Sequence, residues 1–141
     1  MLIRQILTNC ALHSHDIHSF EDERGALAAL EGGRSVPFDI ARVYYLYGVG
    51  AGAERGFHAH RLLHQWAVCV NGSCTMVVDD GRRREAVTLD SPALGLHLGP
   101  MIWREMRDFT PGSVLLVLAS AHHDEADYIR DYAQFIRAAQ A

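Results

Sequence analysis

Two histidines separated by one residue are the side chains of this sequence best suited to chemistry. His58 and His60 follow Arg55 and Gly56 in the run RGFHAH. On a β-strand, alternate residues face the same side, so both imidazoles can reach one cavity. Imidazole titrates near neutral pH and can both remove and return a proton. One histidine would be typical of a buried core residue, whereas two on one face beside an arginine favour an active site.

The same segment resembles the first motif of the cupin superfamily, in which two such histidines precede a metal-binding glutamate. Gln65 stands where that glutamate belongs, and its amide is the poorer ligand. A second cupin motif would supply the last histidine within GLHLGPMIWREM, but Arg104 follows Trp103 there, and a guanidinium cannot coordinate a cation. We therefore predict no bound metal and no other cofactor. His64 either offers a third nitrogen that would reverse this prediction or is an exposed polar residue.

The residues around these histidines have the pattern of an antiparallel β-fold. Between about residues 26 and 120, short β-rich runs alternate with Gly, Pro, Asn and Asp, which predicts a sandwich or barrel. Asp80-Gly81 predicts a hairpin with a type I′ turn, and Asn71-Gly72 predicts a second tight connection. The clearest runs are 40–47, 66–70, 74–80, 85–89 and 113–120.

The last part of the sequence changes to a helical period. Asp124 can cap a helix that continues through Ala139 and packs against the β-body. Its apolar face would carry Tyr128, Tyr132, Phe135 and Ile136. A length of 141 residues fits one domain, with an N-terminal strand or arm at 1–25, a β-barrel core at 26–120 and the helix at 124–139.

The composition limits the partners that this protein can have. The formal net charge is −4, so no global positive field attracts nucleic acid, and no stretch approaches the ~20 apolar residues of a membrane span. All 13 basic residues are arginines; the lack of lysine excludes a Schiff base and leaves guanidinium forks, which suit phosphate. Cys69 and Cys74 lie in apolar runs, so we expect buried thiols in a reducing, cytoplasmic environment.

Several stretches together resemble the dTDP-4-oxo-6-deoxyhexose 3,4-ketoisomerases, which are WxcM-like cupins. The resemblance extends from about Arg24 to Phe135 through RVYYLY, RGFHAH, VCVNGSC, DDG, TLDSPALGLHLGP, WREM and DEADYIRDY. It implies an all-β cupin fold, a jelly roll (double-stranded β-helix) with a C-terminal α-helix, in homodimers that exchange N-terminal strands. It also implies an isomerase of deoxysugar biosynthesis that moves the carbonyl of dTDP-4-oxo-6-deoxyglucose from C4 to C3.

This reaction assigns roles to residues. A base removes the C3 proton, an enediolate forms, and a proton returns to C4. We expect His58 to be the base and His60 to orient the sugar or to relay protons between its two oxygens. Tyr44 can donate a hydrogen bond to the oxygen that becomes negative. Arg42 and Arg55 are candidates for the diphosphate, which a guanidinium fork binds well.

Three further residues complete the expected substrate site. Gln65 and Arg104 would lie against the sugar, with Arg104 and Arg107 replacing histidines of the family's WHEMHDF-like string. The replacement either alters catalytic competence or brings a cation to the enediolate. Arg24 lies in a loop, 22–25, that in this family approaches the sugar and selects the face on which C4 is protonated. Its Arg-Gly pair resembles the members that make the galacto-configured product.

Other polar clusters are better explained without a function. A solvated strand edge that discourages pairing explains the arginines at 82–84. We expect packing at the helix start for His122 and His123. We expect surface positions near the N-terminus for His13, His15 and His18.

Two alternatives use the same residues. A related nucleotide-sugar cupin, such as a 3,5-epimerase, would apply the same carbanion chemistry at other carbons. A non-catalytic sugar- or metal-binding cupin would account for Gln65 and Arg104. The expected partners are a dTDP-linked deoxysugar and a second copy of the chain, without nucleic acid or membrane.

Overall fold

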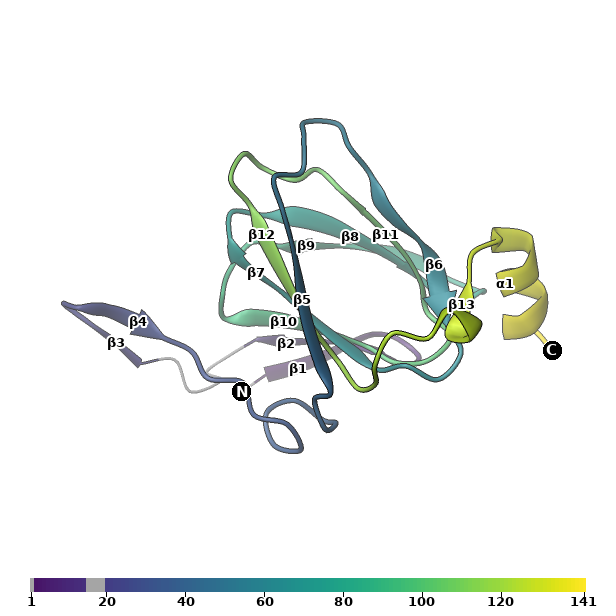
Figure 1. Ribbon diagram of the computed structural model, residues 1–141, viewed down its shortest axis with the longest axis horizontal. Coiled ribbons are helices and arrows are strands. Elements are labelled where there is room, and N and C mark those ends of the chain that lie inside the picture. Colours follow the sequence, from purple (N-terminus) through teal and green to yellow (C-terminus); the bar gives the residue numbers. More distant parts are fainter. Residues whose placement is uncertain (1, 15–19) are drawn as a thin grey trace.

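The computed structural model describes residues 2–14 and 20–141, which form two facing β-sheets and a terminal helix (Figure 1). The larger sheet has six strands in the order β1-β2-β10-β7-β12-β5, and the smaller has five in the order β13-β6-β11-β8-β9. The mostly β fold with a C-terminal helix is confirmed. The elements are β1 (Leu2–Leu7), β2 (Cys10–Ser14), β3 (Phe20–Asp22), β4 (Gly25–Leu27), β5 (Arg42–Tyr47), β6 (Arg55–His60), β7 (Gln65–Asn71), β8 (Cys74–Asp79), β9 (Arg84–Leu89), β10 (Leu94–Leu98), β11 (Trp103–Arg107), β12 (Val114–Ala119), a 3₁₀ turn η1 (Glu125–Asp127), β13 (Tyr128–Ile129) and α1 (Tyr132–Ala139).

The main core lies between the two sheets, because both sheets turn alternate side chains inward. Leu96 and Leu115 of the larger sheet pack there with Met76 and Leu89 of the smaller one. The thiols predicted to be buried, together with that of Cys10, are free and buried. β3 and β4 pair with each other in a separate hairpin, which extends away from the barrel (Figure 1).

A second apolar cluster covers the outer face of the larger sheet. Trp66, which is fully buried, packs there with Val36 of the segment between β4 and β5. The indole lies so close to β10 that a Cβ added at Gly95 would overlap its ring. Only glycine therefore fits at this position beneath Trp66.

The predicted surface position of His13 is wrong. β2 pairs with β10, and the alternation that turns Leu12 into the core places His13 on the outer face, under the covering segment. Its side chain is 6% exposed, and its ring centroid lies 4.6 Å from that of Trp66. His15 and His18 lie outside the described residues.

Of the two remaining polar clusters, the prediction for His122 and His123 is wrong, and the exposed position predicted for the arginines at 82–84 is confirmed. His122 and His123 are exposed and do not lie at the start of the helix, which begins at Tyr132; the His123 ring centroid lies 5.5 Å from that of Tyr128. The three arginines at 82–84 are exposed, as expected: Arg82 and Arg83 lie in the turn before β9, the edge strand of the smaller sheet, and Arg84 is its first residue.

The predicted helix at 124–139 begins too early. Asp124 caps only the 3₁₀ turn η1, and the chain then extends into β13, which pairs with β6. The helix starts at Tyr132 with Asp131 as its N-cap, and Phe135 packs it against Trp103. No helix of the described ranges is long and apolar enough to cross a membrane.

Two predicted turns differ in detail. β8 and β9 do form an antiparallel hairpin, but four residues connect them, and Asp80 lacks the positive φ of a type I′ turn. Asn71 and Gly72 do connect neighbouring strands, but they lead from β7 in one sheet to β8 in the other. This connection therefore joins the two layers.

A bulge in β6 positions the histidine pair. β6 pairs with β11 so that Arg104 faces His58 and Glu105 faces Gly56, which leaves Phe57 as the extra residue. Gly56 has φ 92° and Phe57 has φ 59°. A Cβ at Gly56 would lie 2.9 Å from the Arg104 carbonyl oxygen, so the bulge needs glycine.

We predict that Gly56→Ala destabilises the protein by about 1–3 kcal/mol, the cost of a strained backbone position. Gly50→Ala is the matched control in the preceding loop, because its new Cβ would meet nothing within 4 Å. Urea unfolding of both variants measures the difference. Equal unfolding midpoints would show that the bulge does not require glycine.

Candidate active site

The two histidines of β6 lie side by side at the end of the barrel that η1 and β13 cover. Their ring centroids are 5.0 Å apart and the planes are nearly perpendicular, at 87°. The ring of Tyr128 packs against both, 4.3 Å from His60 and 5.0 Å from His58. The pair is therefore a single compact unit, in which His60 is 1% exposed.

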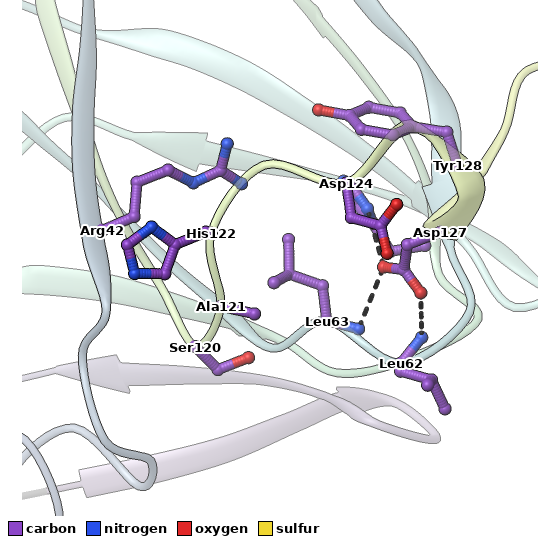
Figure 2. A pocket seen from close by; sticks show the side chains of 10 residues that line it. Arg42, Leu62, Leu63, Ser120, Ala121, His122, Asp124, Asp127 and Tyr128 are labelled. Atoms are coloured by element: carbon purple, nitrogen blue, oxygen red, sulfur yellow. Dashed lines mark hydrogen bonds and ion pairs between the residues drawn. The ribbon is translucent and has the colours of Figure 1, made fainter.

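Two cavities adjoin this unit. The larger, of about 290 Å³, is lined by His58, Tyr44, Arg42, Arg55 and Arg130. The smaller, of about 140 Å³, reaches His60. Its lining also includes Asp127 and His122 (Figure 2). Arg42 and Tyr128 border both cavities. The larger one therefore brings together a histidine, two phenols and three arginines.

A chain of hydrogen bonds leads from Arg104 to the wall of the larger cavity. The Arg104 guanidinium donates to Gln65 Oε1 and, at 3.0 and 3.3 Å, to the Ile102 carbonyl oxygen. Gln65 Nε2 donates to the Tyr44 hydroxyl oxygen at 2.8 Å. Because the Tyr44 oxygen already accepts this bond, its own hydrogen is free to donate elsewhere. The chain thus prepares Tyr44 as a donor to a bound ligand.

Burial and nearby positive charge favour the neutral form of both imidazoles. Burial, followed by Arg104, lowers the pKa of His58 to about 4 and that of His60 to about 2. Both rings are therefore neutral at neutral pH, each with one lone pair available. Burial also raises the pKa of the Tyr44 hydroxyl, so it stays protonated.

The donor set does not suit a metal ion. A cupin metal would need the oxygen of residue 65, but Gln65 Oε1 accepts from Arg104. Arg104 also holds the sequence position expected for the last histidine ligand, and a guanidinium cannot coordinate a cation. His64 does not join the pair, because its Nδ1 lies 3.0 Å from His97 Nε2, beside Phe38. Within residues 2–14 and 20–141, no three His, Cys, Asp or Glu side chains form a metal-binding group.

The structure brings most of the predicted site residues together. His58, His60, Tyr44, Arg42 and Arg55 line the two cavities. Gln65 and Arg104, which were expected to lie against the sugar, lie behind Tyr44. Neither is among the residues lining these cavities.

Two predicted residues lie elsewhere. Arg24 is on the β3–β4 hairpin with an 86% exposed side chain that pairs with Asp22. Arg107 is partly exposed, and its Nε lies 3.6 Å from Asp108 Oδ2.

Three residues of the site were missed, all from the segment misassigned to the helix. Asp127 lies 3.2 Å from His60 Nδ1, Tyr128 packs on both rings, and Arg130 lines the larger cavity. Asp131, a second helix cap seven residues after Asp124, is the signal in the sequence that the helix starts later.

Comparison with known proteins identifies the family. A model of the WxcM-like, C-terminal family matches residues 9–140. The chain belongs to this family. A relative in Aneurinibacillus thermoaerophilus, TDP-4-oxo-6-deoxy-alpha-D-glucose-3,4-oxoisomerase, is 51% identical over 114 residues, which cover 81% of this chain and 82% of the relative.

Solved structures of sugar 3,4-ketoisomerases have the same fold. The chain matches QdtA from Thermoanaerobacterium thermosaccharolyticum, solved with TDP, at 44% identity and a TM-score of 0.91, covering 96% of this chain and 97% of QdtA. It matches WlaRB, a TDP-quinovose 3,4-ketoisomerase from Campylobacter jejuni, at 42% identity and a TM-score of 0.88, covering 93% and 99%.

We predict that in NMR titrations the His58 ring titrates near pH 4, whereas in denaturant it titrates near 6.5. Between these values the unfolded chain binds more protons than the folded one. Stability therefore rises with pH through this window and is lost as the pH falls. A folded-state titration at 6.5 would contradict the burial of this ring.

Proposed function

We propose that this protein is a dTDP-4-oxo-6-deoxyglucose 3,4-ketoisomerase that works without a metal ion. The observation that carries the proposal is the neutral pair His58 and His60 beside a cavity with three arginines, in a chain 51% identical to a 3,4-oxoisomerase. The pair supplies proton transfer and the arginines supply charge for a diphosphate.

The reaction needs only proton movements. His58, on the wall of the larger cavity, takes the proton from C3, and the electrons of that bond form a C3–C4 double bond while the C4 oxygen becomes negative. A proton returns to C4, the C3 hydroxyl loses its proton, and the carbonyl is then at C3. The sugar loses no electrons overall, so the balance requires no cofactor. His60, beside His58, relays a proton between the two oxygens.

Two groups stabilise the negative intermediate. Tyr44 donates its free hydroxyl hydrogen to the enediolate oxygen, in the manner of an oxyanion hole. Arg104 places a buried positive charge behind Tyr44 and Gln65 and acts through them. Arg42 and Arg55 hold the diphosphate, with Arg130 as a third cation.

A deuterium experiment tests the function. We expect the purified protein, with dTDP-4-oxo-6-deoxyglucose in deuterium oxide and excess EDTA, to give a product with its carbonyl at C3 by NMR. A 3,5-epimerase would keep the carbonyl at C4, and a non-catalytic binder would introduce no deuterium. Activity that is lost in EDTA and restored by a divalent metal would contradict the metal-free proposal.

In the same assay, His58→Asn is expected to lower kcat by ~10²–10⁴-fold, the contribution of a general base. dTDP affinity should change little, because the arginines that bind it remain. His123→Asn is the matched control, since His123 is exposed and lies outside both cavities. Undiminished turnover in the His58 variant would remove this residue from the mechanism.

We also propose that the protein works as a homodimer whose subunits exchange their N-terminal strands. The β3–β4 hairpin of a single chain extends from the barrel with Arg24 and Leu27 exposed (Figure 1). β5, the edge strand of the larger sheet, exposes Val43, Tyr45 and Tyr47, a surface suited to a second copy. In the dimer, Arg24 would reach the partner's sugar and select the face on which C4 is protonated. The cytoplasmic location stays a prediction.

Mixing two impaired variants, with formation of the wild-type product as the measured activity, tests the exchange. If Arg24 serves the partner's site, His58→Asn and Arg24→Ala should each be impaired, yet their mixed dimers contain one intact site. Unfolding and refolding the two together should then restore roughly a quarter of the wild-type activity, the statistical share of such sites. A mixture no more active than its components would show that Arg24 does not act across the dimer.

A further inference from the structure

Asp127 is held firmly beside His60. The carboxylate accepts the amide hydrogens of Leu62 at 2.8 Å and Leu63 at 3.3 Å (Figure 2). Its backbone carbonyl accepts from the amide of Arg61 at 2.9 Å. Three hydrogen bonds therefore tie η1 to the residues that follow β6, and they leave Asp127 Oδ2 3.2 Å from His60 Nδ1.

The chemistry of the two groups determines which one donates. A carboxylate can only accept, so the hydrogen bond requires a proton on His60 Nδ1. The ring is neutral, because burial and the nearby charge of Arg104 lower its pKa to about 2. A neutral imidazole carries one proton, so Nε2 must hold a lone pair.

That second nitrogen is the part of His60 available for reaction. His60 Nε2 is buried and has no hydrogen-bond partner among the residues that the structure describes. The rings of His58 and Tyr128 pack against His60, and Arg104 and Arg42 contribute positive charge nearby. Of the residues that the structure describes, Asp127 is therefore the one that determines which ring nitrogen of His60 carries the proton.

We propose that Asp127 is a positioning residue that holds His60 as the Nδ1-protonated tautomer, so that Nε2 accepts and returns the proton during the isomerisation. The part of this inference that concerns proton transfer through Nε2 rests on the proposed function. The tautomer itself does not depend on which sugar is bound.

The tautomer is measured on the wild-type protein. In protein labelled with ¹⁵N in its histidine rings, His60 should show a protonated Nδ1 and a bare Nε2, and Asp127→Asn should reverse the two signals. The asparagine amide can donate to Nδ1, which then keeps the lone pair. A wild-type His60 protonated at Nε2 overturns the proposal, whether or not the variant folds.

Kinetic measurements test whether this tautomer is needed for proton transfer. Asp127→Asn is expected to lower kcat by ~10²–10⁴-fold with little change in KM, because proton transfer is lost and ground-state binding is not. Asp124→Asn is the matched control: it removes a charge from the same cavity, and asparagine caps the turn as well as aspartate does. Its kcat should stay near that of the wild type.

The outcomes separate this inference from the proposed function. A variant with unchanged kcat, or one that loses kcat while His60 keeps its tautomer, overturns a positioning role for Asp127. A wild-type protein with the expected tautomer but no isomerase activity refutes the proposed function and leaves Asp127 as the group that fixes the ring.

Discussion

The buried charge of Arg104 is the constraint on which the rest of the site depends. Its side chain is 3% exposed, and in the part of the chain that the structure describes no carboxylate pairs with it. An uncompensated cation in a protein interior is costly, and burial lowers the pKa of this guanidinium. In the proposed mechanism, a negative charge developing nearby would reduce that cost and make the barrel more complementary to an enediolate than to a neutral ketone.

The same charge organises its neighbours. Burial is the main reason that His58 and His60 stay neutral, and the Arg104 charge adds to it by lowering the pKa of both rings further. The guanidinium also engages the oxygen of Gln65 and thereby turns the Gln65 amide group toward Tyr44. In the proposed metal-free mechanism, Gln65 and Arg104 in place of the cupin ligands give the site a fixed positive charge. A guanidinium cannot coordinate substrate oxygens, so the proposal assigns that contact to Tyr44.

The sequence predicted the parts of the site that depend on local patterns. Alternation on a strand was sufficient to bring His58 and His60 together, because β6 keeps both rings on one side despite its bulge at Phe57. It did not predict Asp127 and Tyr128, because the apolar spacing of 128–136 fits a helix as well as a strand followed by a helix. His13 was misplaced for another reason: the segment that covers it is distant in sequence, and no local pattern reveals such a cover.

The contact between Trp66 and Gly95 links two strands on the outer side of the larger sheet, away from His58 and His60. The indole occupies the space that any side chain at position 95 would need. A larger residue at 95 becomes acceptable only after the tryptophan is replaced, so the two sites are epistatic. Anyone redesigning this barrel has to change position 66 before or together with position 95, because a side chain at 95 is blocked as long as the tryptophan is present.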